Sequence, residues 1–419
     1  MDVQVRKEQN HSLKPLPRIP AIDFVRGLAI ILMALDHAST YWNSGRFFGE
    51  FWFAGRPEVL PDLLQFLVRF VSHWCAPTFV FLAGTSIVLF ETKRLEQGRT
   101  NEEITKHLII RGLLLLLIEW TLIAWLFGAA PFYFGVLAAL GVGLIVFAFL
   151  RKVNTKIILG FSLFLLLTPI FADFIWNPLF EEPGQHPLGF SALYFSFIVD
   201  PLFSGSPEFL TWIQAVVKWP QWPYGLYPLE SWLGVMGLGV VFGRWLVQKQ
   251  QLPDSNRYVA KRLLQTGLFT LLGFFIVRIF QGFPTSYFPI WASDSVLIED
   301  AFAIQNFFFM SKYPPSTVFL LWTLGGMCLA LALAFYYQEN EIFQSWSKPI
   351  TVFGATALFF YCAHLVVYGI VPSILGVKNA FSIQLTLIVW VLGLLILYPV
   401  CIEFRKLKKE YPQSVLKYF

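Results

Sequence analysis

Apolar runs of about 20 residues recur along most of the chain, and this feature restricts its fold more than any other. A helical run of that length is long enough to cross the hydrocarbon core of a bilayer. Only 14% of the 419 residues are charged and 56% are hydrophobic, whereas soluble domains carry about 25% charged residues. We therefore predict an all-α, polytopic integral membrane protein in contact with the lipid bilayer.

Apolar length and flanking charge predict about ten transmembrane helices. Their expected ranges are 21–42, 72–92, 108–128, 132–150, 157–175, 226–247, 263–282, 316–337, 350–371 and 382–402. Most of the 31 Lys and Arg residues lie in the segments that this arrangement leaves on one side, together with both chain ends. Cytoplasmic segments carry such an excess of Lys and Arg, so we expect both termini to be cytoplasmic.

The predicted domain organisation is simple. Residues 1–20 form a mobile cytoplasmic tail, residues 21–402 a single transmembrane domain and residues 403–419 a basic cytoplasmic tail. The net charge of +5 arises from basic residues that flank apolar runs, so it does not indicate a nucleic-acid partner. The four cysteines lie in apolar segments without CxxC spacing, and nucleotide-loop, HExxH and EF-hand motifs are lacking. We therefore predict no metal cofactor.

Three long segments are expected on the outer side, at 43–71, 176–225 and 283–315. They are rich in Trp, Phe and Pro. Aromatic residues at this depth are typical of interfacial belts, but aromatic faces also stack on sugar rings. The sequence leaves both interpretations open.

The first predicted helix carries charged groups at both of its ends. Asp23 and Arg26 lie near its start, and Asp36 and His37 near its finish. Arg26 and His37 are eleven residues apart in the sequence, which is about 16 Å along a helix. Charged groups inside a bilayer cost a few kcal/mol and are usually functional. His37 is a candidate base, with a helix-packing hydrogen bond as the alternative.

Two further histidines lie in predicted spans. His73 opens the second span on the same side as His37 and is either a site residue or an interfacial histidine. His364 lies in the middle of the ninth span, three residues after Tyr361 and four before Tyr368. This spacing places the three rings on one helix face, where they either line a cavity or pack with a hydrogen bond.

Other charged residues complete the list of candidates. Glu119 lies in the middle of the third span and must be neutral or paired there, and Arg278 in the seventh span is its natural partner by sign. Arg111 begins the third span, where it acts as a positive-inside anchor or contacts phosphate. Lys312 belongs to the run Lys312-Tyr-Pro-Pro315 before the eighth span and is a further cavity candidate.

Six stretches, in the same order along the chain, resemble a known family. They are Ile22–His37, His73–Thr85, Arg111–Glu119, Tyr227–Met236, Lys312–Gly325 and Phe359–His364. Together they are similar to bacterial membrane proteins with the heparan-alpha-glucosaminide N-acetyltransferase catalytic domain. The Arg-Gly pair at 26–27, followed by His37, also resembles the acyltransferase-three group of envelope-modifying enzymes.

The resemblance implies transfer of an acyl group across the membrane. The implied donor is acyl-CoA, in particular acetyl-CoA, entering from the cytoplasm. The implied acceptor is an amine or hydroxyl on an extracytoplasmic glycan or lipid-linked molecule. By the acyltransferase-three pattern His37 is the reacting group, oriented by Asp36 or His73, while Asp23, Arg26 and Arg111 bind the donor. The heparan enzyme instead has its reacting histidine beyond the first span, and this chain has no histidine between His37 and His73.

Two other classes of protein share the polar groups within spans. A small-molecule transporter or channel needs no CoA, and a scaffold protein would tolerate loss of Arg26 and His37. The resemblance favours the enzyme and a bacterial plasma membrane location. A homodimer is compatible with the sequence, which does not fix the oligomeric state.

Overall fold

The computed structural model describes residues 18–46, 62–127, 134–176, 227, 229–250, 252–281, 304–310, 312 and 315–419. Within these ranges the secondary structure is helical, with two isolated bridges and no strand. The predicted all-α class is therefore confirmed. The outer-segment residues 47–61, 177–226 and 282–303 lie outside the described residues, so the aromatic segments expected there stay a prediction.

The elements follow the predicted order along the chain. Their bounds are α2 Pro20–Trp42, α3 Leu63–Ser72, α4 Cys75–Glu96, α5 Asn101–Ile118, α6 Ala124–Phe127, α7 Val136–Leu150, α8 Thr155–Trp176, α12 Leu229–Lys249, α13 Ser255–Gln281, α15 Ile304–Phe308, α16 Thr317–Tyr337, α17 Glu341–Ala355, α18 Ala357–Leu365, α19 Val371–Ile374 and α20 Ile383–Glu410. Two π-helical turns, η2 at Glu119–Ile123 and η7 at Val366–Ile370, continue α5 and α18, and a 3-10 turn, η8, covers Val415–Tyr418.

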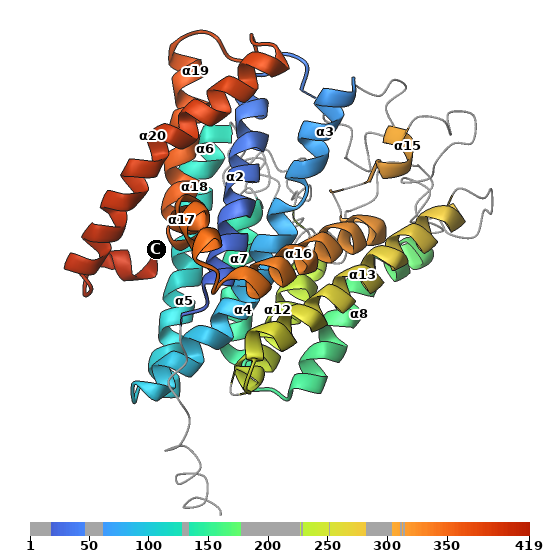
Figure 1. Cartoon of the computed structure of the whole chain (residues 1–419), viewed down its shortest axis with the longest axis vertical. Helices are drawn as coiled ribbons and strands as arrows, with labels where there is room; N and C mark the ends of the chain where they lie inside the picture. Colours follow the sequence, from blue (N-terminus) through green and yellow to red (C-terminus); the bar gives the residue numbers. More distant parts are fainter. Residues whose placement is uncertain are drawn as a thin grey trace, which may run out of the picture.

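Helix α2 lies at the centre of the bundle (Figure 1). It packs against α17, α18 and α20 on one side and against α3, α4 and α16 on the other. Small residues permit this packing: a side chain on Gly27 would overlap the Ile350 carbonyl of α17, and one on Gly354 would overlap the Asp23 carbonyl of α2. Such close approach between helices is typical of membrane bundles.

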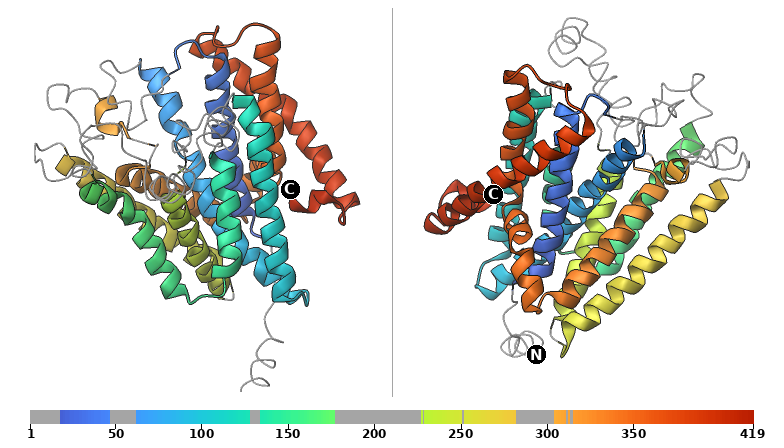
Figure 2. Two further views of the ribbon diagram at one scale, coloured as in Figure 1. Left: turned by 180° about the vertical axis from the view of Figure 1, so that it is seen from behind. Right: turned by 45° about the horizontal axis from the view of Figure 1, so that its top comes forward.

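The remaining long helices form two groups beside α2, one of α8, α12, α13 and α16 and one of α5 and α7 (Figure 2). In the first group, α13 packs on α16 and α12 packs on both α4 and α8. Helix α5 packs on α7, where Gly112 and Gly141 face one another across the contact. The start of α2 and the turn between α4 and α5 lie at the same end of the bundle, which we call the basic face.

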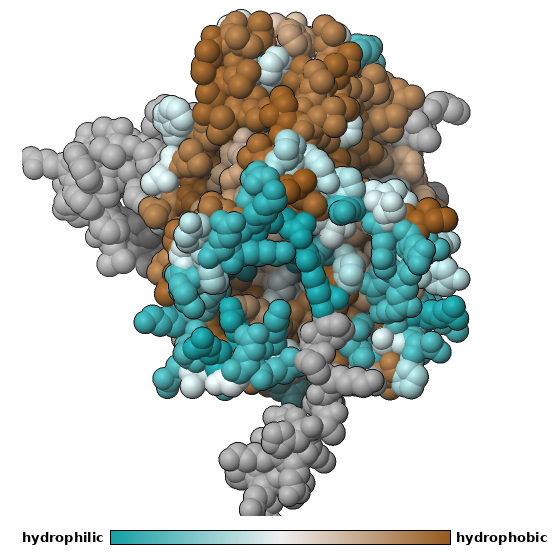
Figure 3. All heavy atoms as spheres, turned by 60° about the vertical axis from the view of Figure 1, so that its left-hand side comes forward, coloured by the Kyte–Doolittle hydropathy of each residue, from teal (hydrophilic) through white to brown (hydrophobic). Residues whose placement is uncertain are grey.

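Six helical segments are long and apolar enough to cross a membrane. They are Leu63–Glu96, Asn101–Phe127, Ser255–Ile279, Thr317–Tyr337, Ala357–Ile374 and Ile383–Glu410. Large apolar side chains on α13 and α20, such as Phe269 and Leu395, are exposed, as expected for contact with lipid. Figure 3 shows a continuous hydrophobic area above a hydrophilic one on this side of the molecule. The chain is therefore an integral membrane protein; the count of ten spans and the cytoplasmic ends stay predictions.

Two predicted helices differ in detail from the structure. The range 350–371 is divided at Thr356, which has φ −121° and ψ 30° and lies between α17 and α18. The second predicted span begins earlier, because α3 leads almost directly into α4 and the two together cover Leu63–Glu96. Asp62 caps α3 by accepting the backbone N–H groups of Leu64 and Gln65, which fixes its start.

Candidate active site

The closest contact between predicted site residues joins His37 of α2 to His364 of α18. Nδ1 of His37 lies 2.6 Å from Nε2 of His364, and the two ring planes are nearly parallel, 17° apart, with centroids 4.9 Å from each other. His364 is fully buried, and its Nδ1 lies 3.0 Å from the carbonyl oxygen of Phe360. The hydrogen-bond partner of His37 therefore comes from another helix and is an imidazole.

Aromatic rings surround this histidine pair. His37 lies against Phe127 and Tyr361, with ring centroids 5.5 and 6.4 Å away. Tyr361 and Tyr368 lie 5.5 and 6.3 Å from the His364 ring. The predicted clustering of these three side chains is thus confirmed, although Tyr368 lies in the π-helical turn η7, which follows α18.

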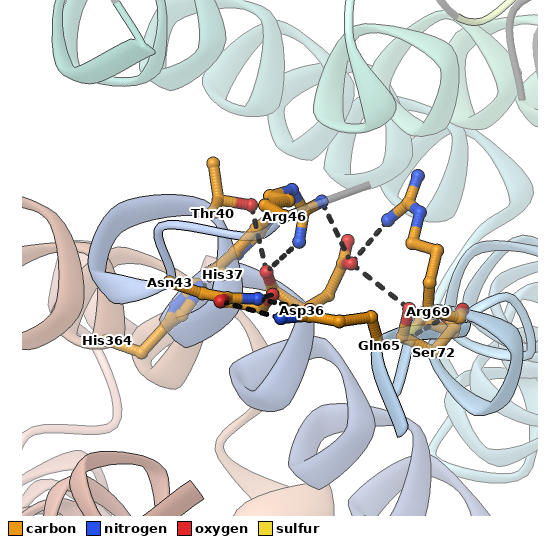
Figure 4. A network of polar contacts seen from close by, with 11 residues as sticks. Asp36, His37, Thr40, Asn43, Arg46, Gln65, Arg69, Ser72 and His364 are labelled. Carbon is orange, nitrogen blue, oxygen red and sulfur yellow. Dashed lines mark hydrogen bonds and ion pairs between the residues drawn. The ribbon is translucent and has the colours of Figure 1, made fainter. Parts of the chain in front are cut away.

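Asp36 faces a different set of residues from its neighbour in the sequence (Figure 4). Its Oδ1 accepts hydrogen bonds from Arg46 Nη2 at 3.1 Å and Ser72 Oγ at 3.0 Å, and it pairs with Arg69. Arg46 also donates to the Asp36 backbone carbonyl at 2.8 Å. Asp36 therefore connects α2 to α3. The sequence predicted that its carboxylate orients the imidazole of His37, but the carboxylate contacts guanidinium groups instead.

The other residues predicted near His37 lie in separate surroundings. His73, between α3 and α4, is buried against Phe70 and Phe319, with ring centroids 6.5 and 5.5 Å away. Lys312 is also buried and lies close enough to Asp36 for a direct charge interaction. Both interact with the charge of Asp36, whereas the ring that contacts Nδ1 of His37 comes from His364.

The predicted ion pair between Glu119 and Arg278 is wrong. Glu119 is buried in η2 and accepts the backbone N–H of Leu137 at 2.9 Å. Arg278 donates instead to the carbonyl oxygens of Phe307 and Phe309. Backbone N–H groups at the start of α7 donate hydrogen bonds to the carboxylate, so it needs no cation beside it. Pairing residues by opposite charge in the sequence could not reveal this.

A cavity of about 340 Å³ lies between the basic face and this histidine pair. It is enclosed by α2, α4, α5, α7 and α18, with Lys408 and Phe419 contributed by the end of the chain. Its polar lining comes from Arg26, Ser86, His107, Arg111, Tyr361 and Lys408. Met33 also lines it and lies one helical turn before His37 on the same face of α2. The cavity therefore extends from a group of cations to the neighbourhood of His37.

The cations that line the cavity near the basic face differ in their hydrogen-bond partners. We call this part of the cavity its basic end. Arg26 donates to Asp23 at 3.0 Å, to Ser86 at 2.9 Å and to the Gly354 carbonyl at 3.3 Å. Lys408 donates to the backbone carbonyl of Phe419. Arg111 has a buried Nε with no hydrogen-bond partner among the described residues. A buried, unpartnered donor is uncommon in folded proteins, and a guanidinium is well suited to phosphate.

A second hollow of about 570 Å³ adjoins the first at Phe90 and His107. Its basic lining residues are Arg94, Arg99, Lys106 and Lys417. The His107 ring lies between Phe90 and Tyr418, with centroids 4.5 and 4.8 Å away. We call this hollow the basic groove. Figure 3 shows hydrophilic residues gathered around a hollow on this side of the molecule.

The sequence singled out some of these residues and missed others. Arg26 and Arg111 were predicted to bind the donor, and both line the cavity. His107 was not singled out by the sequence. Lys408 and Phe419 were not singled out either, because residues 403–419 were predicted to form a basic cytoplasmic tail. The nearest signal for them was the basic and aromatic composition of residues 403–419. Within the part of the chain that the structure describes, no group of three or more His, Cys, Asp or Glu residues could hold a metal ion.

Comparison with known proteins identifies the family of the chain. The family described as "Heparan-alpha-glucosaminide N-acetyltransferase, catalytic" matches residues 18–279. The match covers more than half of the chain and includes His37, Arg26 and Arg111, whereas His364 lies beyond it. A search of curated proteins finds no match. The chain therefore belongs to the heparan-alpha-glucosaminide N-acetyltransferase catalytic-domain family, which indicates a transmembrane acetyltransferase.

Proposed function

We propose that this protein transfers an acetyl or other short acyl group from cytoplasmic acyl-CoA to an amine or hydroxyl on the opposite side of the membrane. The observation that carries the proposal is the cavity between Arg111, whose buried Nε has no hydrogen-bond partner among the described residues, and the surroundings of His37. Acyl-CoA carries phosphates at one end and a thioester at the other. The phosphates match the cations at one end of the cavity, and the thioester matches the surroundings of His37 at the other. The acceptor is an extracytoplasmic glycan or lipid-linked molecule.

The cations of the basic end bind the donor's phosphates. The buried Nε of Arg111 has no hydrogen-bond partner among the described residues, and Arg26, fixed by Asp23 and Ser86, lines the same cavity. Charge-assisted hydrogen bonds of this kind are about twice as strong as neutral ones. The nucleotide lies in the basic groove, where Arg99, Lys106 and Lys417 add positive charge.

The apolar part of the cavity holds the pantetheine arm. Leu115, Leu137, Leu140 and Leu144 line it together with Met33. The volume of about 340 Å³ is within the usual range of about 300–1,000 Å³ for ligand pockets. An arm that enters from the basic end in extended form brings its thioester beside Tyr361 and His37.

His37 carries out the proton transfer of the reaction. It removes the proton from the acceptor amine or hydroxyl as that atom attacks the thioester carbonyl, and the CoA thiolate leaves and takes up a proton. An alternative with the same residue is attack by the imidazole itself, followed by passage of the acyl group to the acceptor. In both routes the bond that breaks is the thioester C–S bond.

The test uses purified protein in lipid vesicles with radiolabelled acetyl-CoA and an extract of cell-envelope glycans and lipids. We expect saturable acetyl-CoA binding, measured as a rise in the thermal transition, and label appearing in one extract component. An unrelated polytopic membrane protein in the same vesicles is the control. Failure to bind millimolar acetyl-CoA would overturn the proposal and favour a carrier.

A further inference from the structure

The buried residue His364 makes two contacts whose chemistry determines where protons lie in the histidine pair. Its Nδ1 is 3.0 Å from the carbonyl oxygen of Phe360, and its Nε2 is 2.6 Å from Nδ1 of His37. A carbonyl oxygen can only accept a hydrogen bond. Nδ1 of His364 must therefore carry the proton that lies between them.

The protonation of His37 follows from that of His364. A neutral imidazole with a proton on Nδ1 has an acceptor lone pair on Nε2. The contact with His37 is then a hydrogen bond only if Nδ1 of His37 donates to that lone pair. In neutral His37 the remaining nitrogen, Nε2, is unprotonated. This nitrogen can accept a proton or attack a carbonyl carbon.

Packing holds His364 in this arrangement. Its side chain is fully buried, and the Phe360 ring stacks on it with centroids 5.5 Å apart. The turn η7 follows directly and is itself held in place, because Tyr368 donates to the Trp390 carbonyl at 2.7 Å and its own carbonyl accepts from Trp42 at 2.9 Å. A residue locked in this way orients its partner through a single hydrogen bond.

We propose that His364 is a positioning residue, which fixes His37 in the tautomer with a free Nε2 and shares the proton that His37 takes up. The inference rests on the proposed function. When His37 Nε2 takes the acceptor's proton, its Nδ1–H can shift to Nε2 of His364, so one proton and one positive charge are held by the pair. That proton returns to the departing CoA thiolate, which leaves both imidazoles neutral.

Two variants at position 364 test this role. His364→Phe keeps the ring packing but removes the acceptor, so we expect kcat to fall about 10²-fold with acetyl-CoA binding unchanged. His364→Gln replaces the acceptor nitrogen by an amide oxygen and should retain at least a tenth of wild-type kcat. Turnover is measured as CoA release with the envelope extract. Wild-type kcat in His364→Phe, or equal loss in both folded variants, would overturn the inference.

A spectroscopic measurement tests the tautomer without relying on turnover. Nitrogen-15 spectra of histidine-labelled protein in bilayers, with the His37 signals assigned by their loss in His37→Ala, should show a protonated Nδ1 and an unprotonated Nε2. In His364→Phe we expect this preference to be lost. The opposite tautomer in the wild type contradicts the inference. If His37→Ala retains wild-type turnover, the role of His37 itself fails, whatever position 364 does; if the wild type neither binds acetyl-CoA nor releases CoA, the proposed function fails.

Discussion

The two ends of the cavity differ in how the protein satisfies their polar groups. At the basic end, Arg111 has a buried Nε without a partner among the described residues. At the histidine end, His37 is bonded to His364, and His364 in turn to Phe360. A cation binds an anion best when it still has hydrogen-bond donors without a partner. A residue that transfers a proton acts best when it is already held in one orientation. This difference is the basis of our proposal that one end of the cavity binds the donor and the other carries out the chemistry.

The largest expected effect is on catalysis and comes from His37→Ala. General acid–base help contributes about 10²–10⁴-fold to a rate, so kcat should fall by that factor while acetyl-CoA binding is unchanged. Turnover and binding are measured on the same vesicle preparation. His11→Ala is the matched control, since the sequence places His11 before the first predicted helix, 21–42. If His37→Ala changed binding and left kcat intact, the assignment of the two ends would be reversed.

The next effect concerns stability and separates Asp36 from its neighbour His37. Asp36→Asn removes the buried carboxylate that Arg46 and Arg69 both contact. Breaking a buried pair typically costs about 3–5 kcal/mol, so the thermal transition should fall clearly. Glu403→Gln is the control: its partner Lys406 is 62% exposed, and exposed pairs contribute about 0–1 kcal/mol. Equal shifts in the two variants would show that the Asp36 cluster adds no special stability.

A smaller effect, on donor binding alone, is expected from Arg111→Ala. Hydrogen bonds to charged groups contribute about 1.5–3 kcal/mol, so KM for acetyl-CoA should rise about 10- to 100-fold while kcat at saturation is retained. Lys406→Ala is the control, because Lys406 is 62% exposed and pairs with Glu403. A loss confined to kcat would place Arg111 in the chemistry instead.

The helices were largely predictable from the sequence, because apolar length and flanking charge act locally. The predicted first range, 21–42, and the observed α2, Pro20–Trp42, differ by one residue. The division at Thr356 was missed, since it results from packing of Gly354 against α2, a contact between residues more than 300 positions apart in the sequence.

The site was predictable as a set of residues but not as a set of contacts. Charge within spans was enough to single out Arg26, Arg111 and His37. The partner of His37 could not be deduced. Helical periodicity predicts on which face of its own helix His364 lies, but it does not predict which other helix packs against that face. The same limit explains the wrong pairing of Glu119, whose actual partner is a backbone N–H.

The most direct test of a single cavity with two different ends is the position of acetyl-CoA bound to the full chain in lipid, determined by electron cryo-microscopy. We predict that the phosphates contact Arg111 and Arg26, that the arm passes Leu140 and that the thioester lies beside Tyr361 and His37. Acetyl-CoA bound elsewhere, or bound with its thioester at the basic end, would contradict the account.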